Sequence, residues 1–337
     1  MSQSKLSFGL WYSLRNPSAW HRPNTEIYAE TLDQIAWAEK IGYDDVWLTE
    51  HHFCEDEHAP SILTLAAAVA VRTQSIRIGT AVLLLPLHDA VRVAEDGATI
   101  DILSNGRFEL GVGIGYRPQE FDGLGISRSD RAGRTNEGLE IIRRLWEGET
   151  VDYDGKHYKI SGANLAPMPV QRPRPPLWVG GFAPASAKRA ARLGDGFIGT
   201  GDISTLVPIY HEERARLGRH GTGRLAGGHF WLIVSNETNK TFSEVAPYII
   251  YQLQMYNVWL TEAGQTPFPQ TNNEQQLRES GMLQVLSPQE AVDAIATYVE
   301  VTGIERYYTW TVPPGMPAAQ MNDYLELFAT DVMPHFR

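Results

Sequence analysis

The sequence predicts an α/β protein that folds as a single (β/α)8 (TIM) barrel. Short apolar runs alternate with amphipathic segments about eight times along the 337 residues, which favours a closed barrel over a bundle or a sandwich. The run at residues 76–85 is apolar without alternation, as in a strand buried on both faces of a parallel sheet. An amphipathic segment at 90–103 and a second apolar run at 108–112 complete one strand–helix–strand repeat. An open doubly wound sheet is the alternative architecture.

The first four strand–helix units are expected before residue 148. The segment at 25–41 is typical of a helix, because Thr25 can cap its start and Gly42 can end it. Strands are predicted at residues 6–11, 45–49, 76–85 and 108–112, and helices at 25–41, 61–71, 90–103 and 131–147.

Two insertions are predicted in the second half, one after the fourth helix and one after the seventh strand. Residues 148–175 contain the hairpin signal Asp154-Gly155 and then a proline-rich stretch, which predicts a hairpin followed by extended chain. Residues 262–282 are polar and rich in Gly, Pro, Asn and Gln. The remaining strands are expected at 177–179, 196–198, 229–234 and 306–310, and the helices at 184–193, 206–217, 242–260, 288–302 and 318–328.

The composition excludes several classes of partner. A net charge of −11 argues against nucleic acid and anionic membrane surfaces. Cys54 is the only cysteine, so no internal disulfide can form and a reducing cytoplasm is the expected location. The amino terminus lacks a signal-peptide core, and no apolar run approaches the ~18 residues of a membrane span.

In a (β/α)8 barrel the active site lies at the carboxyl ends of the strands. The residues expected there are aromatic and glycine-rich with few acids, which suits a planar ligand with a phosphate better than the carboxylates of a glycosidase or a magnesium enzyme. The strand ends are Trp11, Glu50-His51-His52, residues 85–88, residues 113–116, Gly180-Gly181-Phe182, Thr200-Gly201, Ser235 and Trp310.

The turn at residues 179–186 is the candidate phosphate site. Two glycines end a strand there and Pro184 begins a helix, so free amides would face an anion, although an ordinary strand–helix turn looks the same. Arg131 and Arg134 begin another helix, where their charge is unfavourable unless an anion binds.

The histidines near the second strand end favour proton transfer over metal binding. The candidate ligands Glu50, His51, His52, Cys54 and His58 show none of the usual zinc spacings, so no metal is expected. A strand-end histidine suits a proton donor or base. Cys54 is expected to be a buried thiol.

Several motifs together resemble the bacterial luciferase-like flavin-dependent monooxygenases, over nearly the whole chain. They are TEHHF at 49–53, GTAVLLLP at 79–86, VRVAED in the third helix, SNGRFELGVGIG at 104–115, WVGG at 178–181, GDG at 194–196 and LFATDVMP at 327–334. The resemblance implies a (β/α)8 barrel that uses reduced FMN and oxygen, with a separate flavin reductase as partner.

The resemblance also implies roles for individual residues. His51 matches the catalytic base, and Glu50 is its neighbour at the strand end. Ala81-Val82 falls where luciferases have a non-prolyl cis peptide under the flavin ring. Gly113 and Ile114 stand where luciferase has a reactive cysteine and a phosphate-binding arginine, so phosphate binding shifts to Arg131 or Arg134 and light emission is not expected to follow. The other matched cofactor-binding positions are Glu120 and the turn residues Gly181, Phe182, Ala183 and Ser186.

Three functions follow as expectations. The first is a two-component monooxygenase that acts with reduced FMN on a small apolar or carbonyl substrate. The second is a dehydrogenase or reductase of the same superfamily with a deazaflavin coenzyme, and the third is a non-catalytic flavin-binding protein. The resemblance implies a homodimer paired through early helices, and the small residues Ala66, Ala67, Ala68 and Ala70 allow close helix approach.

Residues 262–282 are predicted to form a mobile lid over the flavin site. The segment has few core-forming residues, and a loop of about twenty residues in a compact domain is usually functional or disordered. A flavin that reacts with oxygen needs water kept away. A tolerated surface insertion is the alternative.

Overall fold

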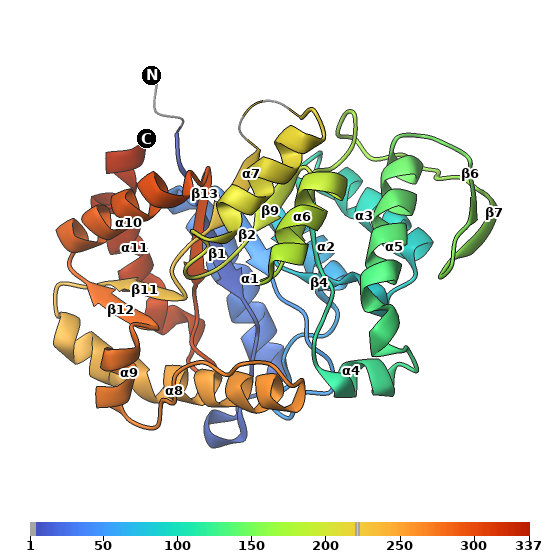
Figure 1. The fold of residues 1–337 in the computed structure, drawn as a ribbon. Coiled ribbons are helices and arrows are strands. Elements are labelled where there is room, and N and C mark those ends of the chain that lie inside the picture. Colours follow the sequence, from blue (N-terminus) through green and yellow to red (C-terminus); the bar gives the residue numbers. More distant parts are fainter. Residues whose placement is uncertain (1–4, 220, 222) are drawn as a thin grey trace.

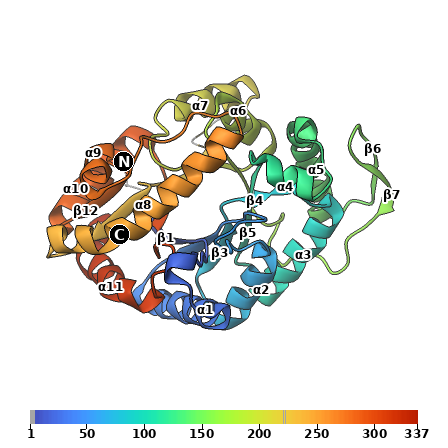
Figure 2. The ribbon, with the colours of Figure 1, turned by 90° about the horizontal axis from the view of Figure 1, so that it is seen from below.

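The computed structural model describes residues 5–219, 221 and 223–337, and its centre is a closed barrel of parallel strands surrounded by helices (Figures 1 and 2). The strand order is β3-β2-β1-β13-β10-β9-β8-β5-β4, and a further pairing of β3 with β5 closes the ring. Because β3 and β4 are two parts of one interrupted strand, the barrel has eight positions, as predicted. The strands are β1 (Ser7–Tyr12), β2 (Asp45–Leu48), β3 (Arg77–Thr80), β4 (Leu83–Leu84), β5 (Phe108–Gly113), β8 (Leu177–Gly180), β9 (Gly196–Ile198), β10 (Arg224–Gly227) and β13 (Arg306–Trp310).

One helix follows each barrel strand and packs its apolar face on the ring. The predicted helices form with small shifts at their ends. The predicted cap of the first helix was wrong, because this helix begins at Asn24 after Pro23 and Thr25 lies inside it. A proline just before a helix fixes an extended backbone at its entry. The helices are α1 (Asn24–Ile41), α2 (Ile62–Arg72), α3 (Ala90–Leu103), α5 (Arg131–Trp146), α6 (Pro184–Leu193), α7 (Leu206–Arg216), α10 (Pro288–Thr302) and α11 (Asn322–Asp331).

Aromatic rings fill the barrel interior where the neighbouring strand carries a glycine directly beside them. The ring of Trp47 lies against Gly79, and the ring of Trp178 lies against Gly196; a Cβ at either glycine would come within 2.3 Å of the ring. On the amino-terminal side of these rings, the buried carboxylate of Glu109 accepts hydrogen bonds from Arg306 Nη2 at 2.8 Å and Trp178 Nε1 at 2.6 Å. This charged layer closes the amino-terminal end of the barrel, so ligands must enter at the other end.

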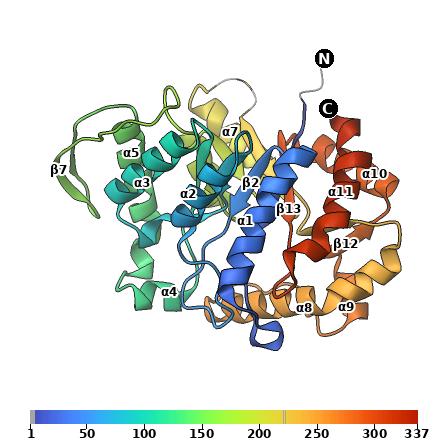
Figure 3. The ribbon, with the colours of Figure 1, turned by 180° about the vertical axis from the view of Figure 1, so that it is seen from behind.

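The insertion at 148–175 forms the predicted hairpin. Strands β6 (Val151–Asp154) and β7 (Lys159–Ala163) pair antiparallel and project from the barrel beside α5 (Figure 3). The chain then returns without regular structure to β8 through the cis peptide bonds Ala166-Pro167 and Arg172-Pro173.

The prediction for the seventh barrel strand was wrong. The predicted run at 229–234 forms β11 (Trp231–Val234), which pairs outside the barrel with β12 (Leu283–Leu286); the barrel position belongs to β10. The apolar run is buried because helices pack on it, while β10, a strand of the same length, contains arginine and glycine. Ser235 therefore lies at the end of a strand outside the barrel and not at its mouth.

The insertion after the seventh strand is larger than predicted. Between β11 and β12 lie α8 (Thr238–Glu262) and α9 (Glu274–Ser280). In Figures 1 and 2, α8 runs across the end of the barrel to which α4 (Pro118–Gly123) also belongs. Residues 262–282 thus include a short helix anchored by the buried Leu277, and their role as a lid stays a prediction. Within the described residues, no helix is long and apolar enough to cross a membrane.

Candidate active site

The carboxyl ends of the barrel strands and α8 enclose a group of polar and aromatic side chains. The loops after β1, β2, β4 and β5 supply the polar groups, and α8 supplies Tyr256 and Trp259 above them (Figure 2). The predicted site residues fall into three parts of this mouth, namely the pair His51–Glu120, the cluster around Glu50, and the turn after β8.

His51 and Glu120 form a buried pair. The Nδ1 atom of His51 lies 2.7 Å from Oε1 of Glu120, which also accepts the backbone N–H of His52 at 3.0 Å. Burial raises the pKa of Glu120, but the charge of His51 and these hydrogen bonds lower it below its usual range, so the carboxylate is ionised. Within the described chain, Nε2 of His51 has no hydrogen-bond partner. A fixed carboxylate on one ring nitrogen leaves the other to exchange a proton with a ligand.

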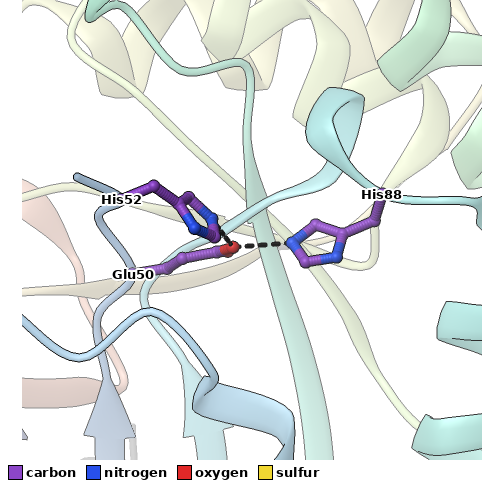
Figure 4. Close-up of side chains that lie close together, drawn as sticks. All are labelled: Glu50, His52 and His88. Carbon is purple, nitrogen blue, oxygen red and sulfur yellow. Dashed lines mark hydrogen bonds and ion pairs between the residues drawn. The ribbon is translucent and has the colours of Figure 1, made fainter. Parts of the chain in front are cut away.

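Glu50 joins two other histidines (Figure 4). Its Oε1 accepts hydrogen bonds from Nε2 of His52 and Nε2 of His88, both at 2.6 Å, and its Oε2 accepts the N–H of Leu84 at 2.6 Å. Burial raises the pKa of Glu50, but the two imidazoles lower it to about 2. The same carboxylate raises the pKa of His88 against the effect of its burial.

Among the described residues, Glu50, His52 and His88 lie close enough together to be possible ligands of a metal ion. Both imidazole nitrogens point at one carboxylate oxygen, which satisfies them without an ion (Figure 4). The cluster therefore holds the loop after β2 to the chain after β4, and the expectation of no metal stays a prediction.

The chain between β3 and β4 has the predicted cis peptide bond at Ala81-Val82. The side chain of Val82 occupies space that Gly113 and Gly180 leave open, because a Cβ at Gly113 would lie 2.5 Å from Val82 Cγ2 and a Cβ at Gly180 would lie 2.7 Å from Val82 Cγ1. Gly113 thus makes room for the neighbouring strand rather than presenting a reactive group.

The turn after β8 fits an anion such as a phosphate. Among the described residues, no partner accepts the backbone N–H of Gly181, Phe182 or Ala185, and α6 begins there at Pro184. Ser186 Oγ donates to Ala183 O at 2.6 Å and holds the turn. Phe182 is 75% exposed, so the turn faces solvent. Free amides at the positive end of a helix are the elements of an anion site.

Arg131 and Arg134 differ in how they are used. Arg134 donates from Nε to Pro86 O at 2.8 Å and lies over the ring of Tyr158, so it holds the loop after β4. Arg131 donates from Nη1 to Arg128 O at 2.7 Å, and its buried Nε has no partner in the described part of the chain. Of the two predicted phosphate ligands, Arg131 is therefore the one with a buried N–H group, at Nε, that is available to a phosphate.

Sequence reasoning missed two arginines. Arg15 follows β1 and is fully buried beside Asp56, with 2.8 Å between Nε and Oδ2. Arg117 follows β5 and donates to His52 O at 2.8 Å, and its guanidinium carbon lies 4.2 Å from the centre of the Trp259 ring. Arg15 comes four residues after the predicted first strand, and this position near a strand end was the available signal.

Comparisons with known proteins show what this chain is similar to. A family model described as luciferase-like monooxygenase matches residues 6–305. An uncharacterized protein, y4wF of Sinorhizobium fredii, is 32% identical over 72% of each chain. The oxygenase component of a flavin-dependent trigonelline monooxygenase from Acinetobacter baylyi is 25% identical over 92% of this chain and 90% of its own. An F420-dependent glucose-6-phosphate dehydrogenase from Amycolatopsis mediterranei is 36% identical over 51% of this chain, which spans 53% of that enzyme's length. Likewise, this chain spans 48% of the length of the relative y4vJ.

Solved structures show the same fold. The monooxygenase RslO1 from Streptomyces bottropensis superposes with a TM-score of 0.86 at 22% identity, over 98% of this chain and 100% of that one. An F420-dependent secondary alcohol dehydrogenase has a TM-score of 0.77 at 19% identity, with 99% of each chain covered. The fold is thus shared by oxygen-using and F420-using enzymes.

Proposed function

The chain belongs to the luciferase-like monooxygenase family, and we propose that it is the oxygenase component of a two-component flavin-dependent monooxygenase. It would receive reduced FMN from a separate reductase and act on a small molecule at the barrel mouth. When bound, reduced FMN supplies the two electrons that place one oxygen atom of O2 in the substrate and release the other as water.

The pair His51–Glu120 carries this proposal. Both residues are buried, and the His51 ring lies 5.0 Å from the Trp259 ring of α8. Their 2.7 Å contact fixes the imidazole through Nδ1 and leaves Nε2 without a partner in the described chain. In this role His51 exchanges a proton with the substrate, and Glu120 holds the ring and balances its charge. The exposed amides of the turn at Gly181 and the free Nε of Arg131 would bind the FMN phosphate.

A dehydrogenase that uses F420, a deazaflavin, is the second candidate. The relatives named for F420-dependent glucose-6-phosphate dehydrogenase activity support it, with 36% identity in one case. The trigonelline relative favours the monooxygenase, since it aligns with 92% of the chain against 51% for that dehydrogenase.

Oxygen consumption distinguishes the two. The protein is mixed with photoreduced FMN, oxygen and a panel of small aromatic acids and ketones, and catalase is then added. Catalase returns half of the oxygen that has ended as hydrogen peroxide, so a deficit is a return of less than half of the oxygen consumed. A deficit that needs both protein and substrate supports a monooxygenase. Turnover with reduced F420, together with no deficit for FMN, would replace the proposal with the dehydrogenase.

A further inference from the structure

Polar atoms beneath α8 are buried without the hydrogen bonds that they need. Within the described residues, none of the three guanidinium nitrogens of Arg15 donates a hydrogen bond, and neither does Nε of Arg117. The side chain of Arg15 has no exposed surface, and that of Arg117 is 2% exposed. Buried polar groups in folded proteins are nearly always satisfied, so these N–H groups point to an acceptor that binds there.

The acids already present do not meet this need. Asp56 lies 2.8 Å from Arg15 Nε and neutralises its charge, but it does not lie along an N–H direction. Glu120 lies 3.5 Å from Arg117 Nη1 and is held by His51 and by the backbone N–H of His52. A planar acceptor with two oxygens matches the free N–H groups of a guanidinium, and a carboxylate has this shape.

Arg15 lies away from the turn that fits a phosphate, whereas Arg117 follows β5, the strand next to β8. Arg15 follows β1, and Gly181 follows β8; in the barrel order these two strands are four positions apart in either direction, which is diametrically opposite. An anion at Arg15 is therefore distinct from a phosphate at the Gly181 turn, and a second ligand is needed to provide it.

The surroundings define the rest of that ligand. The guanidinium carbon of Arg15 lies 4.7 Å from the centre of the Trp259 ring and 4.9 Å from that of Tyr256. The ring of His51 lies 5.0 Å from Trp259 and 5.7 Å from Tyr116. A flat aromatic body packs favourably against guanidinium and aromatic groups of this kind. Because Trp259 is only 3% exposed, the turn of α8 that carries Tyr256 and Trp259 must shift when a ligand enters.

We propose that Arg15 and Arg117 form the anion-binding end of the substrate site, and that the substrate is a small planar molecule with a carboxylate. The class of substrate rests on the proposed function, but the binding of an aromatic carboxylate does not. The carboxylate accepts the free N–H groups of the two arginines, and the planar body lies against Trp259 within reach of His51.

Binding of benzoate, measured by calorimetry with the full-length protein, tests the proposal. Benzamide is the neutral control of the same shape. We expect benzoate to bind and benzamide to bind at least tenfold more weakly, and we expect Arg117→Gln to weaken benzoate about tenfold or more, since charge-assisted hydrogen bonds are lost. Arg15→Gln leaves Asp56 buried without its partner, so Arg15→Gln/Asp56→Asn is the variant that keeps the site neutral. Arg92→Gln, at a 68% exposed arginine on α3, is the matched control and should bind as the wild type does.

Three results would overturn the proposal. They are equal binding of benzamide and benzoate, undiminished benzoate binding by both Arg117→Gln and the Arg15/Asp56 double variant, and no binding of benzoate with or without FMN. A loss of FMN affinity in these variants that spares riboflavin would also overturn it, because the arginines would then bind the flavin phosphate. Benzoate binding without any oxygen deficit would leave the anion site standing and reject the monooxygenase.

Discussion

His51 combines a free ring nitrogen with a fixed carboxylate at the other. Glu120 is ionised because His51 and the backbone amide of His52 lower its pKa more than burial raises it. The negative charge of Glu120 therefore lies beside the imidazole of His51, whose own charge changes when it transfers a proton. A substitution of His51 or of Glu120 removes one member of this pair and leaves the turn that fits a phosphate unchanged.

Replacing His51 with alanine should reduce substrate turnover by about 10²–10⁴-fold, the usual contribution of a positioned acid–base group. FMN affinity should change by no more than a few-fold, because His51 does not belong to the turn after β8. Turnover is measured by steady-state kinetics and FMN affinity by fluorescence titration. His335→Ala, at an exposed position near the carboxyl terminus, is the control. A wild-type rate in His51→Ala would reject the role of this residue.

Glu50 makes a pH-dependent contribution to stability. Its pKa is lowered to about 2 in the folded protein, so its contribution is present above the ordinary value of 4.5 and is lost as the pH falls toward 2. The pKa of His88 is raised, so its contribution is present below the ordinary value of 6.5 and is lost as the pH rises through the folded-state value. Both contributions are therefore complete between about pH 4.5 and 6.5.

Glu50→Gln should accordingly destabilise the protein most within that window, by about 3 kcal/mol from the shift of Glu50 alone. Urea unfolding of both proteins at several pH values measures the difference. Glu95→Gln, which removes an exposed i,i+3 ion pair with Arg92, should have little effect at any pH. A difference for Glu50→Gln that does not vary from pH 3 to 8 would contradict the pairing with the two histidines.

At the scale of elements, regular repeats were predictable and departures from them were not. The hydrophobic pattern and the start and stop residues placed α3, α6, α10, β9 and β13 at the observed bounds. The run at 229–234 is as apolar as a barrel strand. It lies between α8 and the barrel, and this position buries it as fully as a place in the ring would. Whether such a strand joins the ring depends on which neighbour pairs with it, and β10, with its arginine and its glycine, has only two apolar residues, too few to predict a strand.

The same limit explains which site residues were found. His51, Glu50 and the turn at Gly181 lie directly at strand ends and within recognisable motifs. Arg15 and Arg117 lie in loops, and only the packing of α8 over the mouth buries them. Their partners Asp56, His52 and Trp259 are distant in sequence, so no local pattern marks them apart from the position of Arg15 near a strand end.

The start of α5 offers a test of the phosphate site. Arg131→Gln should weaken FMN binding much more than riboflavin binding, because its unpartnered Nε is the donor available to a phosphate in the described structure. Arg134→Gln should affect both ligands alike, since Arg134 holds the loop at Pro86. Fluorescence titration with the two flavins gives the ratio. Equal losses for Arg131→Gln would show that this arginine does not contact the phosphate.

At the scale of the molecule, the barrel divides the mouth into two halves. The turn after β8 presents amides to solvent on one side, and the buried arginine after β1 lies on the other. The cis peptide at Ala81-Val82 and the Glu50 cluster belong to the strand between β2 and β5. On the proposed function, a flavin phosphate at β8 and a second ligand at β1 would lie on opposite sides of the mouth, and His51, which follows β2, would lie on the side of the second ligand.

The outer faces of α2 and α3 are expected to pair two copies of the chain. These helices pack side by side, and their outward residues include Val71 at 64% exposure, Leu103 at 46% and Ile102 at 39%. Exposed apolar side chains on neighbouring helices favour association with a partner. Of the four alanines predicted to allow this contact, Ala66 and Ala70 are buried in the core and cannot face a partner, because they pack on the barrel. The half-buried Ala67 and Ala68 remain available to it.

Light scattering at micromolar concentration should give the mass of two chains of 37.7 kDa each. Val71→Glu should shift the mass toward that of one chain, because two like charges would be buried in a symmetric contact. Val301→Glu introduces the same charge at a valine of similar exposure, 59%, on α10, and should leave the dimer intact. A monomeric mass for the wild type would reject the dimer, and dissociation by Val301→Glu but not by Val71→Glu would move the contact to the opposite side of the barrel.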